Sequence, residues 1–161
     1  MERTKAPLAF LLAQVGAHAA MRFGERVSRL NLTPPDAGIL RLLDASGGLS
    51  QQALSTRLGI HPSRLVAILD ALEEEQLVER QANRDDRRQY ALHLTEKGKR
   101  TLKDIGRIAR EHTESLCASL SAAEREQLCD LLQKIATEQE LSPGVHPGYG
   151  RMRPGTKEIK A

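Results

Sequence analysis

Aromatic residues are nearly absent from this 161-residue sequence: they make up 2% of it, and tryptophan does not occur. Hydrophobic residues still reach 40%, so a core has to be built from Leu, Ile, Val and Ala. Such an aliphatic composition favours packed helices over a β-sandwich, which is normally richer in Val, Thr and aromatics. The length predicts one domain, or one compact domain with extensions.

Cysteines, clustered metal ligands and long apolar runs are also scarce. Cys117 and Cys129 are twelve residues apart, which fits neither a redox pair nor a zinc cluster, and we interpret both as small buried residues on helices. The five histidines share no metal-site spacing, and no nucleophile–base pair or Gly-rich phosphate loop occurs. We therefore predict no enzyme, no cofactor and no metal site. No membrane span or signal peptide is recognised, so a cytoplasmic protein is expected.

The sequence has almost no excess of positive charge outside its end. Its net charge is +3, and residues 141–161 contain four bases and one acid. The other 140 residues therefore hold twenty bases and twenty acids. A uniformly basic nucleic-acid binder is excluded, and any DNA-binding surface has to arise from segregation of charge between faces.

Apolar spacings of three and four, with helix caps at their starts, divide the chain into helices. Thr33 before Pro34, Ser50, Pro62, Thr95 and the capping box of Ser121 with Glu124 mark helix starts. Two short runs between the fourth and fifth helices alternate as strands do. The predicted elements are helices at 8–30, from 34, at 51–58, from 62 to about 76, from 95 and from 121, with strands at 77–80 and 90–94.

The helix that starts at Pro62 has two different faces. Leu65, Ile68, Leu69 and Leu72 recur at i, i+3, i+4 and i+7 and are predicted to face the core. Polar residues occupy the other face near its start, whereas Glu73–Glu75 would be repelled by phosphate. Only the first half of this helix is therefore expected to approach DNA, as in the docking of a recognition helix.

A charged segment, Asn83-Arg84-Asp85-Asp86-Arg87-Arg88, separates the two strand-like runs. A helix, a turn, a second helix and then a charged hairpin predict a winged helix-turn-helix, which places a helix in one groove of a duplex and a hairpin in the next. Taken alone, the segment would also fit a solvated hairpin tip.

The order and spacing of these motifs resemble the MarR (multiple antibiotic resistance regulator) family. The resemblance covers residues 32–98 specifically and the flanking helices less so. It is carried by Leu32-Thr33, Leu49-Ser50-Gln-Gln-Ala-Leu54, Leu58-Gly59, Leu69-Asp70-Ala-Leu72, Leu77-Val78-Glu-Arg80, Asp86-Arg87-Arg88 and Leu94-Thr95-Glu-Lys-Gly98. The resemblance implies a mainly α homodimer with a small β-wing, which binds a pseudo-palindromic double-stranded DNA operator, as a repressor.

Candidate DNA-contacting residues follow from this resemblance. The family's Asp-x-Arg motif maps onto Asp86 and Arg88; the carboxylate would direct the guanidinium into a narrow minor groove, where negative potential is concentrated. On the recognition helix Arg64 is the main long polar residue, because Val66 and Ala67 stand where the family often has polar residues. The full set is Ser50, Gln51, His61, Ser63, Arg64, Ala67, Arg84, Asp86, Arg87 and Arg88.

The sequence departs from the family pattern at a second position, and it leaves control by an effector open. Gln76 replaces a Gly that is usual in the family, and we expect it to adopt a left-handed conformation. Release by a small aromatic or carboxylate-bearing effector is a hypothesis, with pocket candidates His18, Met21, Arg22, Asp36, Arg41 and His112. His112 lies on an apolar stripe, a position more typical of a satisfied core histidine than of a ligand-binding residue.

The predicted division of the chain is a dimerisation region at 1–32 and 101–140, a winged helix-turn-helix at 33–100, and a Pro/Gly-rich basic tail at 141–161. The tail is expected to be a flexible arm, with an ordered strap across the partner subunit as the alternative. The competing function is a winged-helix module that binds proteins and not DNA, which the neutral body and Glu73–Glu75 keep open.

Overall fold

The computed structural model describes residues 6–82 and 90–150. Within these ranges the chain is mainly helical, with a small antiparallel sheet of strand order β1-β3-β2. The predicted fold class is thereby confirmed. The elements are α1 (Leu8–Val27), a 3₁₀ turn (Ser28–Leu30), α2 (Pro34–Ser46), β1 (Leu49–Ser50), α3 (Gln51–Leu58), α4 (Pro62–Glu74), β2 (Val78–Ala82), β3 (Tyr90–Leu94), α5 (Glu96–Leu116) and α6 (Ala122–Glu138).

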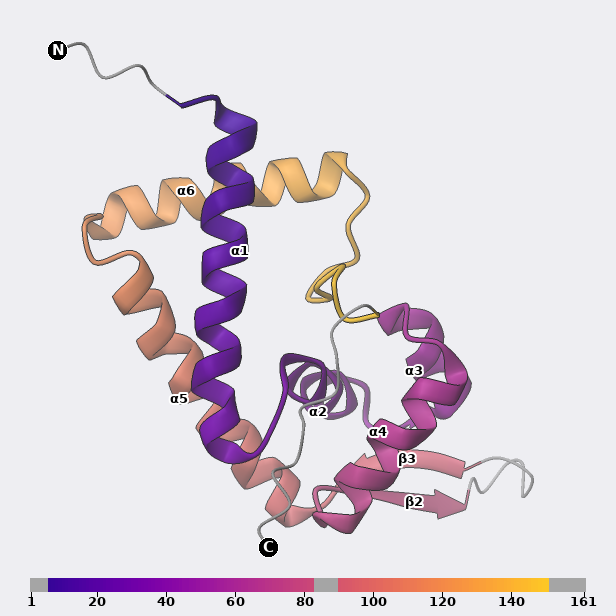
Figure 1. Ribbon diagram of the computed structural model, residues 1–161. Helices are drawn as coiled ribbons and strands as arrows, with labels where there is room; N and C mark the ends of the chain where they lie inside the picture. Colours follow the sequence, from indigo (N-terminus) through magenta and orange to yellow (C-terminus); the bar gives the residue numbers. More distant parts are fainter. Residues whose placement is uncertain (1–5, 83–89, 151–161) are drawn as a thin grey trace, which may run out of the picture.

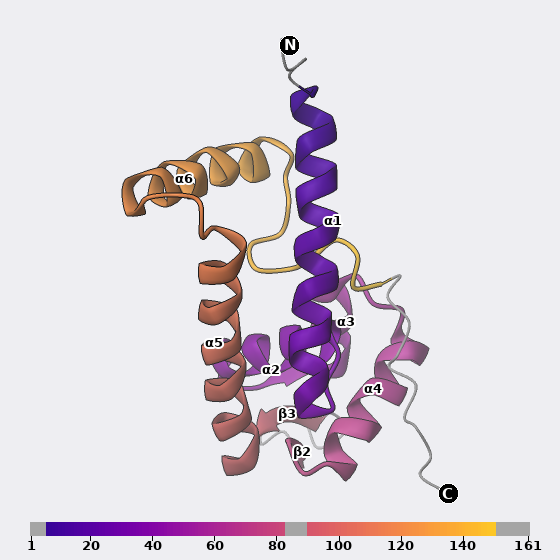
Figure 2. The same ribbon diagram turned by 60° about the vertical axis from the view of Figure 1, so that its left-hand side comes forward.

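Two long helices extend from a compact lobe, and one of them leads into a crossing helix (Figure 1). The lobe contains α2, α3, α4 and the sheet. α1 and α5 extend from it, and the chain turns at the far end of α5 into α6, which runs across that end. α1 packs against α5 and α2, and the ring centroids of Phe23 and His112 lie 5.7 Å apart. The same lobe is seen from another side in Figure 2.

Side-chain caps set the helix starts where the sequence predicts them. Thr33 and Asp36 form a capping box at α2, with the Thr33 amide donating to the Asp36 carboxylate at 2.7 Å. Ser50 Oγ accepts from the Ala53 amide at 3.1 Å at α3, and Ser121 and Glu124 form a second capping box at α6. These contacts satisfy backbone donors that the first helical turn leaves open.

The lobe is held by an aliphatic core. The four α4 residues predicted to face it are buried: Leu65, Ile68, Leu69 and Leu72. Leu54 of α3 and Leu92 of β3 are also buried. At the start of α5, a β-carbon on Gly98 would lie 2.1 Å from the carbonyl oxygen of Leu77, so only glycine lets α5 approach the start of β2 this closely.

The turn between α4 and β2 contains a residue in an unfavourable conformation. Gln76 has φ 59°, the left-handed region predicted for it. Thr95 Oγ1 donates to the Gln76 carbonyl at 2.5 Å, and Lys97 Nζ donates to the Glu75 carbonyl at 2.7 Å. Two hydrogen bonds from the start of α5 therefore hold this turn in place, although the left-handed conformation is unfavourable for a residue other than glycine.

Replacing Gln76 with glycine is expected to raise the free energy of unfolding by about 0.5–1 kcal/mol, because glycine adopts positive φ without a steric penalty. Urea unfolding followed by circular dichroism measures the change. Gln133→Gly is the matched control, since Gln133 lies within α6 and glycine there costs about 1 kcal/mol. A destabilised Gln76→Gly protein would contradict the strain assigned to this turn.

Three observations depart from the sequence interpretation. The two-residue strand β1 pairs with β3 through Leu49 and Leu92 and was not predicted. Cys129 is exposed and Cys117 half-buried, and both are free, so the prediction of buried cysteines is wrong within one chain. Residues 142–150 pack on the lobe of their own chain, with Tyr149 only 8% exposed.

No helix in the described ranges has the length and apolarity needed to span a bilayer.

Candidate nucleic-acid interface

The candidate recognition helix α4 presents polar residues at its first turn. His61 is its N-cap, with Nδ1 2.8 Å from Ser63 Oγ and accepting from the Ser63 amide. His61 and Ser63 are exposed, and Arg64 is half-buried. Further along the same exposed face are Val66 and Ala67, so the short apolar side chains expected there do reach solvent.

The first helix of the pair, α3, contributes the other candidates in the lobe. Ser50 uses its hydroxyl to cap α3, and Gln51 is the first residue of this helix and is half-buried. A shallow depression of about 390 Å³ is lined by Ser50 and by four residues not predicted to contact DNA: Gln52, Ala53, Thr56 and Arg57. Arg57 is exposed and adds a cation to this face.

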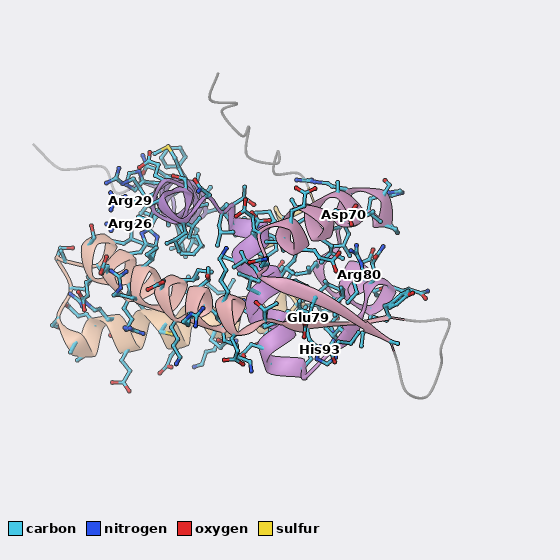
Figure 3. All side chains as sticks on the ribbon, turned by 90° about the horizontal axis from the view of Figure 1, so that it is seen from below. Arg26, Arg29, Asp70, Glu79, Arg80 and His93 are labelled. Atoms are coloured by element: carbon cyan, nitrogen blue, oxygen red, sulfur yellow. The ribbon has the colours of Figure 1, made fainter. Side chains whose placement is uncertain are left out.

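The second half of α4 is acidic, and its charge is partly neutralised. Arg80 of β2 pairs with both Asp70, at 2.6 Å, and Glu73. Arg80 and Asp70 lie next to each other in Figure 3. The hydrogen bond that Arg80 donates to the Asp70 carboxylate raises the pKa of Arg80, so the guanidinium stays charged. The pair therefore fixes the wing strand against α4 and screens two carboxylates from any nearby phosphate.

The strands β2 and β3 form the base of the predicted wing. They pair antiparallel over their full lengths, from Val78 opposite Leu94 to Ala82 opposite Tyr90. The chain between them carries the predicted wing residues Arg84, Asp86, Arg87 and Arg88, and these lie outside the described residues. The outermost pair, Ala82 and Tyr90, thus fixes where this segment leaves and rejoins the lobe.

The candidates for an effector pocket do not all lie together. His112 of α5 packs against Phe23 of α1, and its pKa is lowered by burial first and then by nearby Arg26, Arg22 and His18. These four basic groups thus form one corner between α1 and α5. Arg26 Nε is buried there, without a hydrogen-bond partner among the described residues, and Figure 3 shows Arg26 on α1.

The other three pocket candidates have different surroundings. Asp36 belongs to the α2 capping box, and its pKa is raised by burial against the opposing effect of its hydrogen bonds with Thr33. Arg41 donates to the carbonyl of Gly144, and Met21 is 55% exposed on α1. A cavity of about 520 Å³ lies elsewhere, lined by Asp44, Glu79, His93, Glu96, Lys99 and neighbouring residues between α2, the sheet and α5.

Comparisons with known proteins agree with this geometry. The model of the MarR family matches residues 32–90. A Thauera aromatica protein to which regulation of the hcr operon is ascribed is 33% identical over 112 residues, which are 70% of this chain and 68% of that protein. An HTH-type transcriptional repressor of Mycobacterium tuberculosis is 29% identical over 133 residues, 83% of this chain and 96% of the relative.

Solved structures of similar proteins include complexes with DNA. The transcriptional repressor CouR, bound to a 23-mer DNA duplex, has 35% identity and a TM-score of 0.71, over 81% of this chain and 92% of that one. A MarR family protein of M. tuberculosis in complex with DNA has 28% identity and a TM-score of 0.70, over 81% of this chain and 98% of that one. Both alignments extend well beyond the residues that the family model matches.

Proposed function

The chain belongs to the MarR family, and on that premise we propose that it is a DNA-binding transcriptional repressor acting at an operator as a homodimer. The observation that supports this most directly is the arrangement of α3, α4, β2 and β3 as a winged helix-turn-helix, in a chain similar over most of its length to repressors solved on DNA. Such a regulator acts at the chromosome, so we assign it to the cytoplasm and to no enzymatic role.

The first half of α4 is the part proposed to read base edges in the major groove. Arg64 is the one long polar side chain among the candidates there, with His61 and Ser63 beside it. Val66 and Ala67 offer apolar contact to thymine methyl groups. With few polar readers, much of the sequence preference is expected to come from DNA shape. Ser50 and Gln51, at the start of α3, are assigned to the phosphate backbone.

The segment between β2 and β3 is proposed to act in the adjacent minor groove. Asp86 would set the direction of Arg88, and Arg84 and Arg87 would contact phosphates beside it. The physical reason is that a narrow minor groove concentrates negative potential and favours an oriented guanidinium. The register of β2 and β3, which brings Ala82 opposite Tyr90, supports a hairpin at this place.

Dimerisation is assigned to residues 1–32 and 101–140, and DNA binding to residues 33–100. The support is an uncovered apolar stripe on α6, made by Leu128, Leu131, Leu132 and Ile135, each 38–51% exposed. A further exposed apolar group lies on α1: Leu8, Phe10, Leu11, Leu12 and Val15. Single exposed leucines are ordinary, but contiguous apolar stripes of this kind mark interaction surfaces. A symmetric pair would place two recognition helices about 34 Å apart, one turn of the duplex.

Capture of genomic fragments by the purified protein, followed by footprinting, tests the proposed function. We expect enrichment of a pseudo-palindromic site with two protected half-sites about one helical turn apart. Weak binding of all fragments with no protected site would contradict a repressor reading, even if the protein retained some affinity for DNA.

Release by an effector is proposed at the basic corner formed by His18, Arg22, Arg26 and His112. A carboxylate there would meet two permanent positive charges, the guanidinium groups of Arg22, which also bonds to Glu25, and of Arg26. It would also accept from Arg26 Nε, which is buried without a partner among the described residues. We expect small aromatic acids to raise the melting temperature and to weaken operator binding. Arg26→Gln should lose both effects, with Arg107→Gln of α5 as control. A full screen that changes neither quantity would contradict an acidic effector.

A further inference from the structure

The segment Ser142–Gly150, called here the C-terminal strap, is folded on the lobe. It runs from the end of α6 to the N-terminal end of α4 (Figures 1 and 2). Two turns shape it, with the Val145 amide donating to the Ser142 carbonyl at 3.1 Å and the Tyr149 amide to the His146 carbonyl at 3.0 Å. The rings of His146 and Tyr149 lie 5.6 Å apart. The strap therefore has its own ordered shape.

The strap is anchored on α2 by a close fit. Tyr149 is 8% exposed and joins the aliphatic core, with Val145 packed beside it. A β-carbon on Gly38 would lie 2.6 Å from the Tyr149 ring, so the absence of a side chain on α2 makes the slot that the ring fills. Arg41 donates to the Gly144 carbonyl. Burial raises the pKa of Tyr149, consistent with a neutral phenol in this slot.

The far end of the strap binds Arg64, the main candidate for reading DNA bases. Arg64 Nη1 donates to the Gly150 carbonyl at 2.5 Å. Arg64 Nη2 is buried and has no hydrogen-bond partner among the described residues. Gly150 also lies against the turn before α4. A β-carbon on Gly150 would be 2.7 Å from the carbonyl oxygen of Gly59. One amino group of the guanidinium is therefore bonded to the strap, and the other is buried.

We propose that the C-terminal strap is an autoinhibitory element that restrains DNA binding by holding Arg64. The inference rests on the proposed function. An arginine reads a guanine edge with two N–H donors at once, and it cannot do so while Nη1 is bound to Gly150 and Nη2 is covered. Operator binding therefore requires the strap to leave, and the apparent dissociation constant equals the intrinsic one divided by the undocked fraction.

Tyr149→Ala tests the proposal, because it removes the anchor and keeps the basic residues 151–160 that a truncation would lose. If the strap is docked about nine-tenths of the time, this variant should bind the captured operator about tenfold more tightly. Tyr149→Phe is the matched control: it keeps the ring in the slot and should bind as the parent does. Hydrogen exchange at the Val145 and Tyr149 amides should become faster in the parent when operator is added.

A second variant guards against loss of folding in the first. It deletes residues 142–150 and joins Leu141 to Arg151, and it should also bind about tenfold more tightly. Equal affinities of the parent and both variants, with unchanged exchange at the strap, would overturn autoinhibition while leaving DNA binding intact. Weaker binding by both variants would show that the strap positions Arg64 for DNA, the opposite role. If no form binds any fragment, the proposed function itself fails, and the strap's role with it.

Discussion

Glutamate in place of Leu131 is expected to convert the protein into monomers that no longer hold operator DNA. Leu131 is 51% exposed at the centre of the α6 stripe, so the change costs a single chain little. In a dimer the same carboxylate would be buried without a partner, at a cost of about 3–5 kcal/mol. The dimer dissociation constant should rise at least about a hundredfold, as measured by sedimentation equilibrium.

The control for this variant is Gln133→Glu, which adds the same charge on the other side of α6, away from Leu128, Leu131 and Ile135. It should remain dimeric and bind DNA as the parent does. If Leu131→Glu is folded and still dimeric at micromolar concentration, the α6 stripe is not the dimer interface, and the assignment of residues 101–140 to dimerisation fails with it.

Loss of the Arg88 side chain is expected to weaken operator binding by about 1–3 kcal/mol, roughly 5–150-fold. The reason is that a guanidinium in a narrow minor groove gains more from the concentrated phosphate potential than a surface base does. Mobility-shift titration of Arg88→Ala against the parent operator measures the loss. Competition with unrelated DNA separates loss of specific binding from loss of general attraction.

Arg107→Ala is the matched control for Arg88→Ala. Arg107 lies on α5, exposed and paired with Asp104 and Glu111, and its removal lowers the net charge by the same amount. It should change operator affinity by less than twofold. Equal losses for the two variants would mean that Arg88 contributes only general charge, and the minor-groove assignment would be wrong.

Local chemistry explains why so much of the fold could be predicted. Each of the caps formed by Thr33, Ser50 and Ser121 bonds to a residue three positions later in the chain. Such local pairs can be recognised in the sequence. The inward face of α4 follows from helical spacing alone. The left-handed conformation of Gln76 was predictable only through the resemblance to the MarR family, in which a Gly is usual at this position.

Contacts between distant segments explain what could not be predicted. β1 is two residues long and exists only because β3 lies beside it. The bond of Arg80 to Asp70 needs α4 and β2 folded back on each other. The strap is the clearest case: its Pro/Gly-rich composition predicts a flexible arm, yet Tyr149 finds a slot made by Gly38, more than a hundred residues earlier. A single aromatic residue in a polar tail is a weak signal until the slot is known.

Binding to an operator as a dimer is tested by titrating the protein against promoter fragments from its own genome, from low to moderate salt, with the stoichiometry of the complex measured at each point. We expect one tight complex containing two chains per site. The logarithm of its affinity should fall linearly with the logarithm of salt concentration, because phosphate contacts release counterions. A monomeric protein that binds no fragment even at low ionic strength would contradict operator binding as a dimer, and would favour a winged-helix module whose partners are proteins.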